Sequence, residues 1–305
     1  MLAAFLTTIL FSISAVCGNR TAKLLGGTRA NFARLCVAAV LLALYAHTLG
    51  GGIAGSAFGI FFLSGCIGFG IGDMALFQAL PRLGSRLSVL LTLCLSAPLA
   101  ALIEWWWLRT LLSPAEIVCA LVILAGVAVA LAPGAHVHIA RKDLWWGLSF
   151  GLLAAFCQAL GAVLSRKGFA LAQAAGENID GITAAYQRIL GGVLLGAVVF
   201  AVVKYNSRHP LPAEAGGGRQ ASPWRRAWLL VLINGLAGPA LGVSFYQWAL
   251  KTTPTGVVLP IVAITPIVII PFAFWLEGER PGSRSLLGGA IAVAGAAALA
   301  WVKSS

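Results

Sequence analysis

Asp73 is the residue whose type and position most clearly suggest chemistry, because it stands inside a long apolar stretch. The segment GFGIGDMALFQAL places glycines at 68, 70 and 72 just before its carboxyl group. A charge at the centre of a membrane helix costs about 2.5–3.5 kcal/mol on insertion scales, so it needs a partner or a function. Burial favours the neutral form of a carboxyl group, which suits proton or cation coupling. A structural ion pair with Arg34 or Arg188 is the alternative.

Arg34 and Arg188 lie near the starts of two apolar stretches, in FARLCVAAVLLAL and AYQRILGGVLLGAV. A guanidinium group in such a place can bind a substrate carboxylate or phosphate through paired hydrogen bonds. It can equally extend along the helix so that its charge reaches the membrane surface. The sequence leaves both interpretations open.

Large uncharged polar side chains also interrupt the apolar stretches, namely Gln158, Tyr246 and Gln247, with the smaller Asn19 near the end of the first one. From the interior of a helix bundle these groups can bind a solute. Interhelical hydrogen bonding is the competing role, and it is worth only about 0.6–2 kcal/mol. Weaker candidates of the same kind are Ser12, Ser14 and Asn234.

Prolines inside the apolar stretches form a second group of functional candidates. Pro98, Pro260 and Pro266 each remove a backbone hydrogen bond and can kink a helix. A kinked helix can act as a hinge that gates a pathway, or it can be a static feature of the packing.

The composition shows what surrounds these residues. Of the 305 residues, 60% are hydrophobic and only 10% are charged, and the mean hydropathy is +0.93. Soluble domains have about 25% charged residues, so this chain is predicted to be a multi-pass integral protein of a plasma (inner) membrane. The net charge of +12 comes from basic residues in short loops beside apolar spans, so nucleic acid is not an expected partner.

The apolar runs are continuous and long enough to cross about 30 Å of hydrocarbon as helices, which predicts an all-α membrane protein of about ten transmembrane helices. The predicted spans are 2–19, 29–48, 56–78, 84–107, 112–132, 143–163, 182–204, 226–249, 255–276 and 284–302.

The two halves of the chain resemble each other. At a constant offset of 170, Gly68, Gly72 and Ala79 fall on Gly238, Gly242 and Ala249. We therefore predict a first five-helix repeat at 1–135 and a second at 141–305, with a flexible polar loop at 205–225. Because each unit has an odd number of helices, the second copy is expected to be inverted in the membrane. The excess of Lys and Arg in loops after odd-numbered spans predicts that those loops are cytoplasmic and both termini are outside.

Motifs for enzymatic chemistry are scarce. The chain has no HExxH or P-loop motif, and no catalytic residue, metal or cofactor is predicted. His136 and His138 are read as solvated loop residues rather than a metal pair. Glu104, beside three tryptophans, is expected near the membrane surface.

The sequence resembles the EamA-like transporter family of the drug/metabolite transporter superfamily. The similarity rests on WALKTTPTGVVLPIVAITP and FAFWLEGERPGSRSLLGGAIAVAGAAAL in the second half, where Glu279 and Arg280 occupy the Glu-Arg positions of a family turn. FQALPRLGSRLSVLLTLCLSAP fits in the first half. The resemblance implies two inverted five-helix repeats and secondary transport, often metabolite or amino-acid export.

Together these features predict a secondary transporter that moves a small metabolite, amino-acid-like or drug-like, and most simply exports it by alternating access. Its expected partners are the small-molecule solute, the lipid bilayer and protons or another coupling ion; no oligomeric state is predicted. The alternative is a membrane-embedded lipid flippase, or an enzyme that acts on a lipid-linked substrate. Polar residues gathered at mid-depth favour the transporter, whereas a seam open to lipid favours the alternative.

Overall fold

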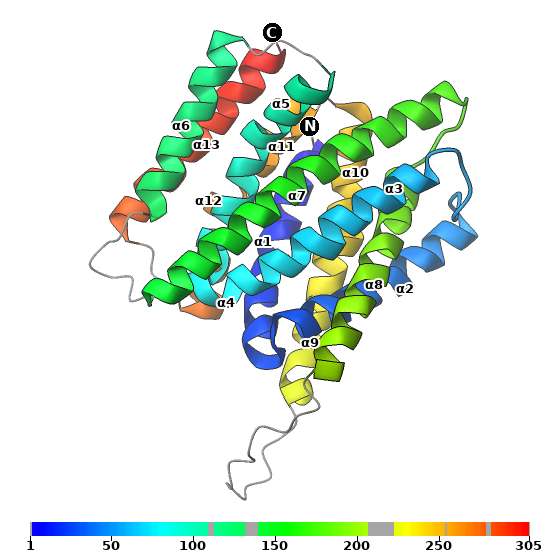
Figure 1. Cartoon of the computed structure of the whole chain (residues 1–305), viewed down its shortest axis with the longest axis horizontal. Coiled ribbons are helices and arrows are strands. Elements are labelled where there is room, and N and C mark those ends of the chain that lie inside the picture. Colours follow the sequence, from blue (N-terminus) through cyan, green and yellow to red (C-terminus); the bar gives the residue numbers. More distant parts are fainter. Residues whose placement is uncertain are drawn as a thin grey trace, which may run out of the picture.

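The computed structural model is a bundle of tilted helices (Figure 1). It describes residues 2–108, 113–131, 140–206, 223–253, 255–278 and 282–304. Across these residues the regular elements are α-helices and three π-helical segments, η1 to η3. The elements are α1 (Leu2–Leu25), α2 (Gly27–Thr48), α3 (Phe58–Gly65), η1 (Cys66–Gly72), α4 (Asp73–Val89), η2 (Leu90–Cys94), α5 (Leu95–Leu108), α6 (Pro114–Leu131), α7 (Arg141–Ala174), α8 (Gly181–Asn206), α9 (Pro223–Gly235), η3 (Leu236–Gly242), α10 (Val243–Thr252), α11 (Thr255–Val262), α12 (Thr265–Glu277) and α13 (Ser283–Ser304).

Seven helices in the described part of the chain are long and apolar enough to cross a membrane. The segments Pro114–Ala130 and Leu286–Leu299 are shorter apolar helices. Many large hydrophobic side chains point outward, among them Trp106 and Trp275, which are 74% and 83% exposed. A soluble protein rarely exposes so much apolar surface, so the chain is a multi-pass integral membrane protein.

Two helices extend beyond the ends that the hydropathy pattern predicts. α1 continues to Leu25 rather than ending at residue 19, and α7 runs to Ala174 rather than to 163. Charged residues end the apolar run in both cases, but they do not end a helix. The chain instead turns at Gly26 and Gly176, whose φ angles of 80° and 75° favour glycine.

The predicted span at 255–276 is divided into two helices. α11 ends at Val262 and α12 begins at Thr265. Pro260 lies inside α11, and Pro266 lies in the first turn of α12, where its missing N–H would have no intrahelical partner. Pro98 lies within α5, just after η2.

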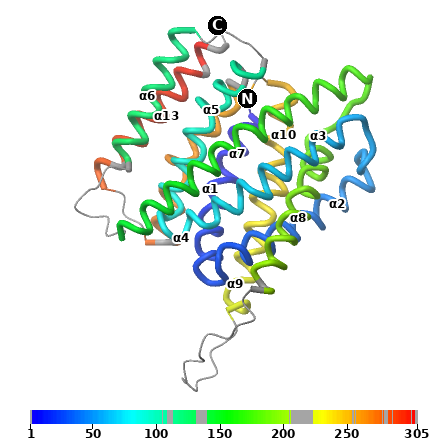
Figure 2. Tube along the Cα trace, in the orientation of Figure 1, coloured from blue at the N-terminus to red at the C-terminus, as the bar shows by residue number. Residues whose placement is uncertain are grey.

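The helices form two connected regions. α6 and α13 lie side by side along one edge (Figure 2), and their backbones approach closely because Gly126 and Gly288 each face the other helix. The larger region centres on α1, which packs against α9, α12 and α4.

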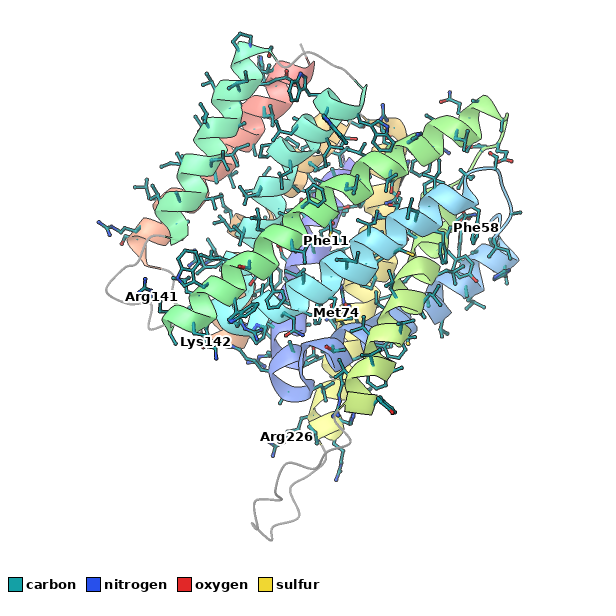
Figure 3. The ribbon with its side chains drawn as sticks, viewed as in Figure 1. Phe11, Phe58, Met74, Arg141, Lys142 and Arg226 are labelled. Carbon is teal, nitrogen blue, oxygen red and sulfur yellow. The ribbon has the colours of Figure 1, made fainter. Side chains whose placement is uncertain are left out.

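Both termini lie near the top of the view in Figure 1, and Arg141, Lys142 and Arg226 lie near the opposite edge in Figure 3.

Candidate functional site

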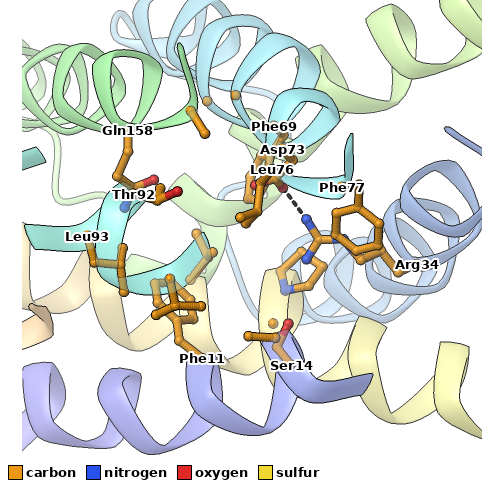
Figure 4. A pocket seen from close by; sticks show the side chains of 18 of the residues that line it. Phe11, Ser14, Arg34, Phe69, Asp73, Leu76, Phe77, Thr92, Leu93 and Gln158 are labelled. Carbon is orange, nitrogen blue, oxygen red and sulfur yellow. Dashed lines mark hydrogen bonds and ion pairs between the residues drawn. The ribbon is translucent and has the colours of Figure 1, made fainter. Parts of the chain in front are cut away.

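A cavity of about 80 Å³ lies among the helices of the larger region (Figure 4). This volume accommodates several water molecules or one end of a small solute. Its walls come from α1, α2, η1, α4, η2, α7, α8, η3 and α10. The described lining residues are Phe11, Ser14, Ala15, Arg34, Gly68, Phe69, Gly72, Asp73, Leu76, Phe77, Leu80, Val89, Thr92, Leu93, Ala154, Gln158, Arg188, Gly238, Pro239, Val243 and Tyr246.

An ion pair between Arg34 and Asp73 forms one wall of this cavity (Figure 4). The side chains are 6% and 19% exposed, so both charges are largely withdrawn from solvent. Arg34 Nε also donates a 3.0 Å hydrogen bond to Asn31 Oδ1, and its guanidinium lies 4.5 Å from the centre of the Phe77 ring. These contacts hold the guanidinium in one orientation. The Asp73 side chain, although paired, still lines the cavity.

Arg188 lines the same cavity from α8 and is only 3% exposed. It is close enough to Asp73 for electrostatic attraction, but the described residues offer it no ion pair, and its Nε has no hydrogen-bond partner. Its guanidinium lies 5.2 Å from the centre of the Phe69 ring. The two arginines that the sequence singled out therefore line one cavity in different states: Arg34 is in an ion pair, and Arg188 has none with any described residue.

Two further predicted residues, Gln158 and Tyr246, also line the cavity. The Tyr246 hydroxyl lies near Gln158 and Arg188, yet no hydrogen bond of standard geometry satisfies it, although the residue is only 1% exposed. Thr92 Oγ1 is a third buried lining group without a partner. Buried polar atoms are nearly always hydrogen-bonded, so these groups are available to a ligand or to water.

The structure places Gln247 and Asn19 elsewhere. Neither belongs to the described lining of the cavity; both are fully buried, and both have amide groups without partners. Ser14 lines the cavity and donates a 2.7 Å hydrogen bond to Asn234 Oδ1, which joins α1 to α9. The predictions for Glu279, His136 and the loop at 205–225 fall on residues that lie wholly or largely outside the described ranges, as does the side chain of Glu104.

Several lining residues are not singled out by the sequence, among them Phe11, Phe69 and Thr92. The aromatic residues carry no signal, because an apolar side chain in an apolar helix is equally consistent with lipid contact. A hydroxyl within LLTLCLS is a weak signal that could have indicated Thr92.

All three π-helical segments line the cavity. η1 contributes Gly68 and Phe69, η2 contributes Thr92 and Leu93, and η3 contributes Gly238 and Pro239. π-Helical turns are rare and occur frequently at functional sites, because the extra residue in each turn leaves backbone groups incompletely paired. Glycine also leaves room for an arginine side chain here: a Cβ on Gly68 would lie 2.9 Å from Arg188 Nη2.

A multi-pass membrane protein with a buried, charged cavity among its helices has the architecture of a solute transporter. The sequence model of the EamA-like transporter family matches residues 145–301, just over half of the chain. The chain therefore belongs to the EamA-like transporter family and is a membrane transporter. No curated protein matches the sequence significantly.

The fold is also similar to that of a solved structure titled "Crystal structure of protein". The two share 18% sequence identity with a TM-score of 0.68, and the similarity covers 100% of this chain and 98% of the other. At this identity the comparison supports the fold alone.

Proposed function

We propose that the protein is a secondary transporter that exports a small, amino-acid-like or drug-like metabolite by alternating access around the cavity of Arg34, Asp73 and Arg188. The observation that carries this proposal is a charged cavity enclosed by apolar helices from both halves of the chain. Charged groups are costly at such a site, and they commonly mark the route of a solute or ion.

Alternating access in this fold requires two repeats that move against each other, and several observations support ten spans. Phe58–Trp107 is helical over 50 residues, about twice the length that a bilayer needs. Gly84 interrupts it with φ 81° and ψ 166°. Dividing this segment at Gly84 and adding the two shorter apolar helices brings the seven candidates to ten.

The equivalence of the halves is supported by features that recur at fixed spacing. η1 and η3 begin and end 170 residues apart, at Cys66–Gly72 and Leu236–Gly242. Arg34 and Arg188 are each the eighth residue of a helix that begins with glycine. Five helices in each half require the halves to be inverted with respect to each other.

The contacts between the halves also correspond. A Cβ on Gly65 would lie 1.7 Å from the carbonyl oxygen of Arg188, and a Cβ on Gly235 would lie 2.9 Å from that of Arg34. Each arginine helix thus packs against the glycine-bearing helix of the other half. This reciprocal arrangement supports rocking of one half against the other around a fixed site.

The hinges of this movement are proposed at Pro98, Pro260 and Pro266. All three side chains are buried, and the break between Val262 and Thr265 already separates two helical segments. Backbone groups freed by proline can exchange partners at lower cost than those of a continuous helix.

Asp73 is the proposed coupling residue for protons or another cation, because its carboxyl group is largely withdrawn from solvent, is paired with Arg34 and lies near Arg188. Cells that overexpress the protein should be screened for exported solutes, and the solute found should be followed in proteoliposomes across a range of pH. Asp73→Asn should abolish the pH dependence of flux and lower its rate at least about ten-fold. Asp143→Asn, which changes an exposed carboxylate, should leave both unchanged. Intact flux and pH dependence in Asp73→Asn would refute the coupling role.

A further inference from the structure

Arg188 is a buried cation whose charge the described residues leave unbalanced. The guanidinium lines the cavity, its Nε has no partner, and the nearest carboxylate, Asp73, is already paired with Arg34. Burying an ion without a partner costs several kcal/mol, so such a group is retained only where something compensates it. Neither an acceptor nor an ion-pair partner for it exists within the described ranges.

Glycines on two neighbouring elements leave the space in which the guanidinium lies. Cβ atoms placed on Gly68 and Gly161 would lie 2.9 and 3.3 Å from Arg188 Nη2. The end of the side chain therefore lies beside η1 and α7, and a side chain at Gly68 would crowd it. Phe69 packs against the guanidinium at 5.2 Å from its ring centre. A donor group held in this way loses little entropy when an anion binds it.

Different residues follow η1 and η3, and this difference explains why only Arg34 of the two arginines is paired. Asp73 is the first residue after η1, and Val243 is the first residue after η3. Both line the cavity. A carboxylate therefore compensates Arg34 from the first position, while an apolar side chain occupies the second. The charged side chains among the described lining residues are Arg34, Arg188 and Asp73, which leaves one positive charge in excess.

We infer that the transported solute is an organic anion whose carboxylate or phosphate group pairs with Arg188. This inference rests on the proposed transport function and specifies its substrate class. The planar guanidinium offers parallel N–H donors that match either oxyanion. The unpartnered hydroxyl groups of Thr92 and Tyr246 supply further donors in the same cavity.

The rest of the solute is expected to be apolar. The cavity wall beside these donors consists of aromatic and branched side chains, among them Phe11, Leu76 and Leu93. Such a surface favours an aromatic or branched aliphatic body over a sugar or a polyol, because a hydroxyl without a partner is costly in an apolar site. An amphipathic anion satisfies both the charge and the walls.

Matched probes of one shape can test the charge requirement. The purified protein, in phosphatidylcholine nanodiscs at constant chloride, is titrated with benzoate, neutral benzamide and cationic benzamidine, with phenyl phosphate as the phosphate arm. Thermal unfolding and calorimetry report binding. We expect benzoate or phenyl phosphate to raise the unfolding temperature, and benzamide and benzamidine to have no effect. The anion that binds more tightly identifies the preferred oxyanion.

Two variants test whether Arg188 is the site. Arg188→Gln removes the charge, and Val243→Asp adds a carboxylate to the cavity while Arg188 is kept. Each should weaken anion binding roughly 10- to 100-fold, as expected for the loss of a charged hydrogen bond. Arg141→Gln, which changes an exposed arginine, is the control and should bind as the wild type does. If Arg188→Gln does not fold, Val243→Asp decides.

The outcomes separate this inference from the transport proposal. Absence of anion binding to the wild type, or unchanged binding in the variants, overturns the anion site even if the protein exports a neutral or cationic solute. Binding of the anion that depends on Arg188, without flux of any solute in proteoliposomes, supports the site and overturns the transport mechanism.

Discussion

The guanidinium of Arg34 and the carboxylate of Asp73 form an ion pair that joins α2 to the first residue of α4. The pair is buried among apolar helices, and Asn31 and Phe77 hold the arginine from its other sides. Two charges in such a place depend on each other, because removal of either leaves the other without compensation.

Removal of one member of this pair should therefore be more harmful than removal of both. Asp73→Asn is expected to lower the free energy of unfolding by about 3 kcal/mol, whereas Asp73→Asn combined with Arg34→Gln should recover most of that loss. Chemical denaturation in mixed micelles measures both. A double variant as unstable as the sum of the two single variants would show that the charges do not interact.

The hydroxyl group of Tyr246 should contribute little to stability, because it is buried and the described residues offer it no hydrogen bond of standard geometry. Tyr246→Phe is expected to leave the unfolding free energy unchanged or to raise it by up to about 1 kcal/mol. Tyr186→Phe is the matched control: the Tyr186 hydroxyl lies 2.9 Å from His47 Nε2, so its removal should cost about 1 kcal/mol. Equal losses in the two variants would contradict the assignment of a free hydroxyl to Tyr246.

Gly65 should tolerate no side chain. An added Cβ would lie 1.7 Å from the Arg188 carbonyl oxygen, and a backbone atom cannot move aside without separating α3 from α8. Gly65→Ala is expected to destabilise the protein by about 3 kcal/mol or more and to lower its yield from membranes. Gly59→Ala, on the same helix with open space around it, should be nearly neutral. Comparable yields and unfolding temperatures for the two variants would refute the close contact.

Gly84 is expected to be required for backbone conformation rather than for space. Its φ of 81° and ψ of 166° lie in a region that residues with a Cβ rarely enter. Gly84→Ala should cost about 1–3 kcal/mol of unfolding free energy. Gly282→Ala, where a Cβ meets nothing and φ is not positive, should cost much less. A neutral Gly84→Ala would mean that the connection there adopts another conformation.

The apolar runs correctly predicted an all-α membrane protein, because exclusion from water acts on whole segments, although seven rather than ten helices meet the length and hydropathy of a span in the described residues. They predicted the helix ends poorly: α1 and α7 continue through charged residues to Gly26 and Gly176. Hydropathy reports where lipid surrounds a helix, whereas helix ends depend on local backbone conformation. The break between Val262 and Thr265 likewise follows from prolines rather than from a change in hydropathy.

The charged residues that line the cavity could be singled out from the sequence because each is conspicuous in an apolar helix. Asp73, Arg34 and Arg188 all line one cavity. Neighbouring polar residues could not be separated in this way: Tyr246 lines the cavity while Gln247 does not. Successive residues point about 100° apart around a helix, so the face that each presents depends on how the helix is rotated in the bundle.

The central place of α1 has a consequence for biogenesis. This helix bonds through Ser14 to Asn234, which is synthesised 220 residues later, and it packs against α9, α10 and α12. At about 5–20 residues per second this interval lasts on the order of tens of seconds. A nascent chain that stops before α9 keeps the hydroxyl-bearing face of α1 without its native neighbours, which makes such truncated chains natural targets of membrane quality control.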